Sequence, residues 1–344
     1  MEIKQVNSKN LWDSFINFKN VDFYSFLNSR EWLQLKENLG FKTFKLWIFD
    51  NNELIWVLPI IKTVAKRWTY LFCPHWPLIK TNYFETLEKI KPQLIDLAKK
   101  ENASFIRFNP PVKATKENYE NFKKLWFRNA PIHEHVEDTH LLDLTKSEEE
   151  LFSNLKKKDR YLINRAKKEW VKVRIDNNPD HIEILIKMHY EHSKKVWYVP
   201  FSEKFIKNLY KVFKDNIKTI STSYNWITES ILMTIKYNET VSYYIAASNI
   251  INKKFSPNYL AQRTAILQAK KDWAKIYNFW WVSPDDNVKH PLHWVSDFKR
   301  KWWGYDYFLV HAQDLVISPK YWLTWIVESL RRIKRGYYYV YPKN

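Results

Sequence analysis

The 344-residue sequence contains one cysteine, Cys73, so it can form neither an internal disulfide nor a multi-cysteine zinc site. Long apolar runs are also lacking. A stretch such as residues 54–61 is far shorter than the roughly 20 apolar residues that a membrane-spanning helix needs. Residues 1–4 open no apolar signal segment, and we therefore expect no secretory signal and a cytoplasmic protein.

Glycine is almost absent, with 3 residues where average usage of about 7% would give roughly 24. Tryptophan is abundant, with 18 residues, and several stand where a turn or a helix end favours glycine. Trp170 and Trp273 each follow a lysine-rich stretch at an expected helix end, where glycine adopts a positive φ without a Cβ clash. We hypothesise that many tryptophans are glycines in the natural protein, through UGA codons that specify glycine. The positions are Trp76, Trp170, Trp273, Trp281, Trp294 and Trp303. The alternative is a truly tryptophan-rich protein, and the codons decide between the two.

Positive charge is in excess, because 56 lysines and arginines face 37 acidic residues and give a net charge of +19. Such an excess favours a polyanionic partner. Residues 155–168 read as a basic amphipathic helix, which can meet phosphates or an acidic membrane surface. Further basic clusters at residues 299–301 and 331–335 have aromatic neighbours that suit stacking on unpaired bases. An ordinary solvated surface is the alternative.

Helical and strand-like segments are interleaved along the chain, which predicts an α/β (α+β) class with two mixed domains. The boundary is expected near residue 145, where Thr145 precedes an acidic first turn. Helices are expected at residues 25–39, 83–100 and from 145 to about 168. Strands are expected at residues 43–49, 53–64, 69–73, 103–108, 217–224, 229–236, 240–248 and 276–282.

No pattern of metal ligands or reactive groups stands out. His133 and His135 share one face of a strand, and His189 and His192 are spaced as a helical pair, but no Glu or Cys completes either set at a recognised spacing. Cys73 lies in an apolar strand, as a structural thiol does. With no phosphate-binding loop and no dinucleotide fingerprint in the sequence, we expect neither a metal nor a cofactor.

Two stretches resemble the FemABX family of peptidoglycan-bridge aminoacyltransferases. Residues 141–169 are similar to the start of that family's second domain, and residues 256–304 to its most recognisable segment; residues 57–79 resemble a hairpin of its first domain. Where the family has glycines in the second stretch, this chain has tryptophans. The resemblance is to the shorter, FemX-like members, which lack the coiled-coil arm.

The resemblance implies two tandem GNAT-like acyltransferase domains. Residues 1–145 would form the first domain, which binds the peptidoglycan precursor and is joined by the C-terminal segment 318–344. Residues 146–317 would form the second domain, which carries catalysis and the tRNA side. The implied activity moves an amino acid, glycine foremost, from aminoacyl-tRNA to the stem-peptide amine of UDP-MurNAc-pentapeptide or lipid II. A monomer with peripheral contact to the inner membrane face is expected. The alternatives are an acyl-CoA-dependent GNAT-type N-acyltransferase and a non-catalytic tRNA-binding protein.

The resemblance also suggests site residues. Lys299, beside Phe298, is the expected catalytic lysine. Lys36, on the helix with Trp32, is expected to bind the phosphates of the precursor. Asn109 stands where the family often has an acid and cannot act as a general base. The further expected substrate-binding residues are Arg107, Asn109, Arg160, Arg165, Tyr243, Tyr244 and Ser248. Ordinary ion pairing or packing is the alternative for each.

Overall fold

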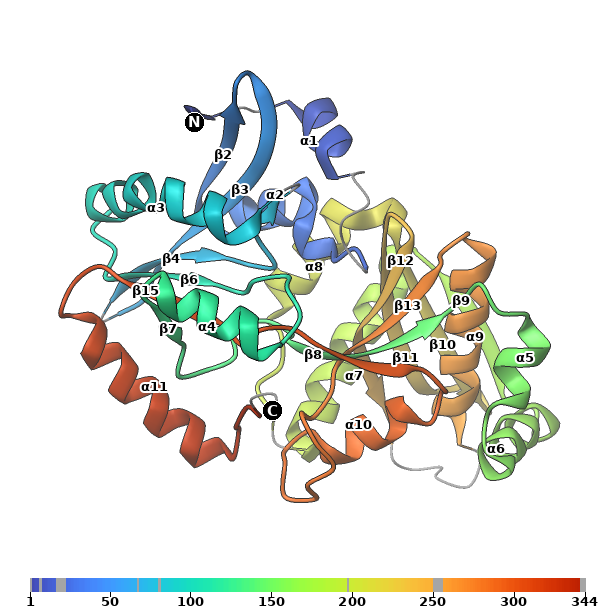
Figure 1. Ribbon diagram of the computed structural model, residues 1–344. Helices are drawn as coiled ribbons and strands as arrows, with labels where there is room; N and C mark the ends of the chain where they lie inside the picture. Colours follow the sequence, from blue (N-terminus) through green and yellow to red (C-terminus); the bar gives the residue numbers. More distant parts are fainter. Residues whose placement is uncertain are drawn as a thin grey trace.

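Two mixed β-sheets with covering helices form the framework of the computed structural model (Figure 1). The structure describes residues 2–5, 8–16, 23–66, 68–79, 82–196, 198–249 and 256–340. The two mixed sheets and their helices confirm the expected α/β (α+β) class. Among the described residues no helical arm projects from the molecule, and its longest helices have 18 residues. No helix in this part of the chain has both the length and the apolar character needed to cross a membrane.

The first sheet has the order β1-β2-β3-β4-β6-β15-β7, and β5 pairs with β3 at its side. Only β4 and β6 run parallel among these neighbours. The strands are β1 (Glu2–Gln5), β2 (Lys42–Asp50), β3 (Glu53–Val64), β4 (Thr69–Cys73), β5 (Leu78–Ile79), β6 (Phe105–Phe108), β7 (Phe127–Asn129) and β15 (Gln313–Val316).

The second sheet has the order β14-β8-β13-β12-β11-β10-β9, with β12 and β13 parallel. Its strands are β8 (Asp138–Asp143), β9 (Lys172–Asp176), β10 (Ile217–Tyr224), β11 (Ile227–Tyr237), β12 (Thr240–Ser248), β13 (Ile276–Trp281) and β14 (Tyr305–Phe308).

Helices connect and cover these strands. They are α1 (Lys9–Ile16), α2 (Arg30–Asn38), α3 (Tyr83–Lys100), α4 (Lys116–Lys124), α5 (Glu148–Ser153), α6 (Lys157–Lys168), α7 (Pro179–Val196), α8 (Glu203–Phe213), α9 (Pro257–Lys271), α10 (His293–Arg300) and α11 (Tyr321–Arg335). Two of the expected helices are split. Residues 25–39 form a short 3-10 turn at Phe26–Asn28 and then α2, because the Ser29 hydroxyl accepts from Trp32 N and begins a new helix. The helix expected from 145 to 168 is α5 followed by α6. Its cap is Ser147, while Thr145 bonds to Asp143 instead.

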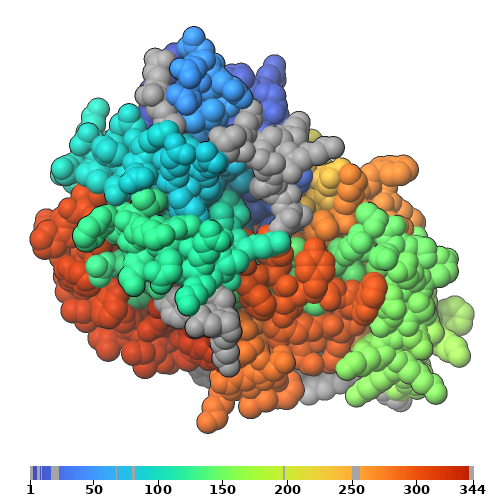
Figure 2. Space-filling view, in the orientation of Figure 1, coloured from blue at the N-terminus to red at the C-terminus, as the bar shows by residue number. Residues whose placement is uncertain are grey.

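The sheets divide the chain differently from the expected domains. Strand β8 precedes residue 145 yet lies in the second sheet, and β15 precedes residue 318 yet lies in the first. Helix α11 then packs on the first half of the molecule (Figures 1 and 2). Its Tyr321 joins an aromatic cluster with Tyr70 and Phe105. One hydrophobic core runs through both halves and includes Trp47 from the first sheet and Met233 from the second. The two sheets therefore share a core through exchanged strands.

Six tryptophans in the described chain have a positive φ, between 55° and 67°: Trp126, Trp170, Trp226, Trp273, Trp280 and Trp303. This backbone is expected at Trp170 and Trp273, which stand two residues after the ends of α6 and α9, and it is found there. A positive φ is not found at Trp76, Trp281 or Trp294. The left-handed residue in β13 is Trp280 rather than its neighbour.

The few glycines that the chain retains occupy positions that demand glycine. Gly40 and Gly336 have φ values of 91° and 70°. A Cβ on Gly304 would lie 2.1 Å from the carbonyl oxygen of Leu141. A bulky residue at positive φ is a genuine conformational outlier. The tryptophan backbone therefore supports the glycine hypothesis at six positions, while the codons stay a prediction.

Candidate functional site

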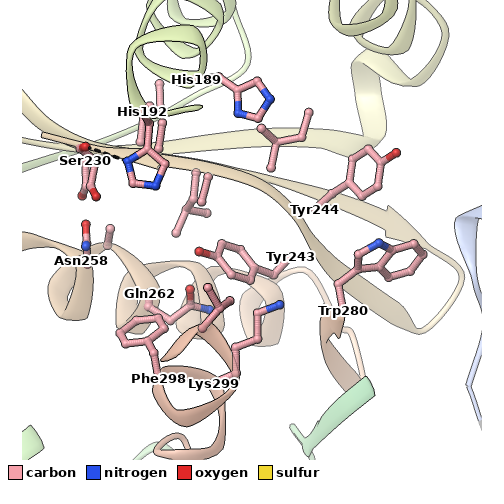
Figure 3. Close-up of a pocket in the computed structure, with 18 of the residues that line it drawn as sticks. His189, His192, Ser230, Tyr243, Tyr244, Asn258, Gln262, Trp280, Phe298 and Lys299 are labelled. Carbon is pink, nitrogen blue, oxygen red and sulfur yellow. Dashed lines mark hydrogen bonds between the residues drawn. The ribbon is translucent and has the colours of Figure 1, made fainter. Parts of the chain in front are cut away.

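A pocket of about 590 Å³ opens in the second half of the molecule, between α7, β11, β12, α9 and α10 (Figure 3). Five residues expected from the sequence line it together: Tyr243, Tyr244, Ser248, Phe298 and Lys299. Figure 3 shows His189 and His192 projecting from one wall, with Phe298, Lys299 and Gln262 on the facing side and Tyr243 between them. Five of the seven expected site residues of the second half thus line one cavity.

Lys299 is buried, with 5% of its surface exposed, although it ends in a pocket. Its Nζ donates a hydrogen bond to the carbonyl oxygen of Trp281 at 2.6 Å and lies 5.7 Å from the centre of the Tyr243 ring. Within the described part of the chain, no carboxylate lies within ion-pairing distance of it. Burial therefore lowers the pKa of Lys299 to about 7. Such an amine can hold a positive charge against an anionic ligand.

The neighbouring Arg300 holds the end of α10 in place. Its guanidinium donates to Asp306 at 2.9 Å and to the carbonyl oxygen of Ser283 at 2.7 Å. These bonds attach the last turn of α10 to β14 and to the loop after β13. Because the turn is fixed at two points, Lys299 is held in position over Trp281.

The two pocket histidines have different hydrogen-bond environments. His189 accepts the backbone N–H of Phe201 at Nε2, and its Nδ1 lies 2.9 Å from the Tyr198 hydroxyl, so both nitrogens are occupied. Burial lowers the pKa of His189 to about 4. His192 donates from Nδ1 to the carbonyl oxygen of Ser248 at 3.2 Å. Its Nε2 has no hydrogen-bond partner in the described chain and keeps a lone pair. His192 can therefore accept a proton at Nε2. The sequence analysis considered His192 only as a possible metal ligand together with His189.

Lys36 and Trp32 lie together on α2, outside the pocket. The Lys36 Nζ is 4.6 Å from the centre of the Trp32 ring and 5.4 Å from that of Phe41. In the described chain no hydrogen bond or ion pair satisfies this ammonium. Burial lowers the pKa of Lys36, while the nearby charge of Glu134 raises it. A cation flanked by aromatic rings and left without a counter-ion is suited to an anionic ligand.

Arg107 and Asn109 also lie outside the pocket, on and just after β6. Arg107 is fully buried and donates to Asp314 at 2.8 Å, to Glu328 at 2.8 Å and to Glu134 at 3.3 Å. Asn109 donates from Nδ2 to Glu137 at 2.9 Å. The guanidinium joins β6 to β15 and α11, so the contacts of Arg107 are those of a structural ion-pair network.

Arg160 and Arg165 lie on α6, away from the pocket. Arg160 donates from Nη1 to the carbonyl oxygen of Ser153 at 2.6 Å and so satisfies the last turn of α5. Arg165 is 3.8 Å from Glu169 on the same helix. Six expected site residues lie outside the cavity that contains Lys299. They are Trp32, Lys36, Arg107, Asn109, Arg160 and Arg165.

The sequence profile of the FemAB family matches residues 219–328, the stretch that carries Lys299 and most of the pocket. Over this stretch the chain is similar to the FemAB family, and the match supports a transferase. No curated protein matches the chain.

Several solved structures have the same fold as this chain. The crystal structure of FemX aligns with a TM-score of 0.79 and 14% identity, over 95% of this chain and 100% of that one. L-PGS from Bacillus licheniformis aligns with a TM-score of 0.56 and 10% identity, over 96% and 98% of the two chains. A tandem GNAT protein from the clavulanic acid biosynthesis pathway aligns with a TM-score of 0.54 and 7% identity, over 84% and 94%. The expected tandem GNAT-like architecture is thereby confirmed.

Proposed function

We propose that this protein is an aminoacyltransferase that moves an amino acid, most of all glycine, from aminoacyl-tRNA onto the stem-peptide amine of a peptidoglycan precursor. UDP-MurNAc-pentapeptide or lipid II is the acceptor, and the product carries the start of an interpeptide bridge. The observation that carries the proposal is Lys299, a buried ammonium without a counter-ion, inside the pocket of the segment that matches the family.

The reaction that this pocket supports is aminolysis of an ester. The acceptor amine attacks the ester carbonyl, a C–N bond forms, and the ribose C–O bond of the ester breaks. Lys299 stabilises the oxyanion, since a preorganised positive charge in a water-poor site acts most strongly on charge that develops in the transition state. The attacking amine loses one proton, for which His192 Nε2 is the acceptor, and the leaving ribose oxygen gains one. No cofactor is needed, because the ester is already activated.

Both substrates are polyanions, which suits a chain of net charge +19. In this proposal Lys36 binds a phosphate of the precursor. A partly buried ammonium without an ion pair gains much from an incoming phosphate, because the ligand supplies the counter-ion that the protein lacks. The precursor would then approach from the first half of the molecule and the tRNA from the second.

The test is a transfer assay with labelled aminoacyl-tRNA and the muropeptide precursor. Lys299→Met is expected to lower kcat by at least about 100-fold, the usual effect of removing one oxyanion donor. Lys301→Met is the matched control, because Lys301 follows α10 directly and pairs with Asp297 at 2.7 Å. Equal loss in both variants, or full activity in Lys299→Met, would contradict the proposed role of Lys299.

The donor is tested in the same assay. Glycyl-tRNA is compared with other aminoacyl-tRNAs and with labelled acetyl-CoA. Transfer from acetyl-CoA alone would establish the acyl-CoA-dependent alternative. Binding of tRNA regardless of its charging, with no turnover, would establish the RNA-binding alternative.

A further inference from the structure

Two histidines and a glutamate converge in the interior, and none of the three lines the pocket. His133 Nδ1 and His311 Nδ1 each lie 2.6 Å from the same carboxylate oxygen, Oε2 of Glu137. The three potential ligand atoms all lie within 4.8 Å of one another. His311 and Glu137 are 1% and 2% exposed, and His133 is largely buried. The cluster joins the segment between β7 and β8 to the segment between β14 and β15, where the two sheets exchange strands.

Each of the three side chains is also held by a hydrogen bond at the atom that points away from the centre of the cluster, which is Nε2 of each histidine and Oε1 of Glu137. His311 Nε2 lies 2.7 Å from the carbonyl oxygen of Ala130, and His133 Nε2 lies 3.3 Å from that of Tyr338. A carbonyl can only accept, so each Nε2 carries hydrogen and each Nδ1 faces inward. The other oxygen of Glu137, Oε1, accepts from Asn109 Nδ2 and from the Ala312 N–H, both at 2.9 Å. Histidine ligands of metals are oriented by such outer hydrogen bonds, as are ligating carboxylates.

The two Nδ1 atoms and Glu137 Oε2 cannot all be paired by hydrogen bonds unless both imidazole rings are charged. Each Nδ1 either holds a second proton, which makes its ring a cation, or presents a lone pair to the lone pairs of Glu137 Oε2 at 2.6 Å. Hydrogen bonds to both rings therefore require two adjacent buried imidazolium ions on one carboxylate oxygen. A single divalent cation removes this conflict, because it accepts a lone pair from both Nδ1 atoms and from Oε2.

We propose that His133 Nδ1, Glu137 Oε2 and His311 Nδ1 bind a divalent transition-metal ion of the zinc class. Two imidazoles and one carboxylate form a donor set that zinc accepts. Ligand bonds of about 2.0–2.2 Å require the two 2.6 Å separations to widen by roughly half an ångström or more. The sequence led us to expect no metal, because no Glu or Cys completes the pair of His133 and His135 at a recognised spacing. The fold supplies His311 as the partner of His133.

The site is structural rather than catalytic. None of the three residues lines the pocket that contains Lys299. Tyr339 stacks on His311 with ring centres 3.9 Å apart, and Tyr338 is bonded to His133, so the C-terminal residues cover the cluster. A metal ion here would link the segment between β7 and β8 to the segment between β14 and β15, next to the C-terminal residues Tyr338 and Tyr339.

The experiment uses the full chain, stripped of metal with a chelator and titrated with Co²⁺ and then Zn²⁺. We expect one Co²⁺ per chain with visible absorption bands of low-symmetry coordination, displacement of Co²⁺ by Zn²⁺, and a higher melting temperature with either ion. Glu137→Gln and His311→Gln should weaken Zn²⁺ binding by at least about 100-fold. His140→Gln is the matched control, since His140 is also buried and bonded to a carboxylate, Asp306, at 2.7 Å. It should bind Zn²⁺ as the parent chain does.

Two outcomes would overturn the proposal. One is a parent chain that takes up no Co²⁺ or Zn²⁺ and melts at the same temperature with and without them, which would assign the cluster to a pair of imidazolium ions. The other is stoichiometric binding that persists in both ligand variants. Should the variants fail to fold, proton NMR of the Co²⁺-loaded parent chain decides. Two shifted, exchange-protected N–H signals are expected from the two Nε2–H groups, and the absence of such signals counts against the site.

Discussion

Replacing exposed, left-handed tryptophans by glycine should stabilise this protein, against the usual trend for removing aromatic residues. The perturbation is a fourfold variant at the positions that have both a positive φ and an exposed side chain. These are Trp126, Trp170, Trp226 and Trp273, which are 80%, 84%, 92% and 87% exposed. Because these side chains bury so little, their removal forfeits little apolar contact.

The magnitude follows from the backbone. A left-handed conformation costs a residue with a Cβ about 1–2 kcal/mol, and glycine escapes most of that cost. Glycine also loses roughly 0.5–1 kcal/mol through the greater freedom of the unfolded chain. The net gain is then about 0.5–1 kcal/mol per site and roughly 2–4 kcal/mol for four separate turns. Asn225-Trp226 joins β10 to β11 with both residues at positive φ, where Asn-Gly is the preferred pair.

The assay is urea unfolding of the parent chain and the fourfold variant, with Trp294→Gly as the matched control. Trp294 is 75% exposed but lies inside α10 with a helical backbone, so glycine there should destabilise by about 1 kcal/mol. Trp280 is left unchanged, because it is 5% exposed and stacks on Phe26, and its removal would leave a cavity. A fourfold variant no more stable than the parent would refute the strain argument. Mass spectrometry of the protein from its own source tests glycine at these positions directly.

Two further predictions concern buried lysines. Burial lowers the pKa of Lys299 to about 7, whereas an unfolded lysine titrates near 10.4. Between these values the unfolded chain binds more protons, so the free energy of unfolding should rise from pH 7 toward pH 10. In Lys299→Met this rise should shrink and stability at pH 6.5 should exceed that of the parent; an unchanged pH profile in urea titrations would contradict the burial argument. Lys36→Met should raise KM for the precursor by about tenfold with little change in kcat, as lost phosphate binding does. The control Lys45→Met removes a lysine that already pairs with Glu37 at 2.7 Å, and an equal rise in KM there would count against Lys36 as the phosphate ligand.

Local patterns in the sequence were enough to predict many elements of the fold. Strands β4, β10 and β12 and helix α3 have the expected bounds, because apolar periodicity and bounding turn residues act over a few neighbours. The lysine-rich end of α9 leads to Trp273, which has a positive φ, as the sequence indicates. The resemblance of residues 256–304 to the FemABX family then placed Lys299 beside Phe298, and both line the pocket.

Other features depend on pairings across the whole chain. No local sequence feature indicates that β8, which precedes residue 145, pairs in the second sheet. Which strands pair depends on the sheet edges that are available in the folded protein, and not on neighbouring residues. The sequence suggested Arg107 as a substrate ligand, whereas in the structure its guanidinium forms ion pairs with three carboxylates from other segments of the chain.

The sequence by itself determined the positive charge, the helix and strand segments, the unusual tryptophans and the family lysine, because each depends on composition or on neighbouring residues. The tertiary structure alone decided which polar groups lie in the pocket and which are held in the core. Glu137 and His311 meet across 174 positions of the chain, and no spacing rule reaches that far. Burial and partner choice, which fix the charge state of each group, arise only when the two sheets come together.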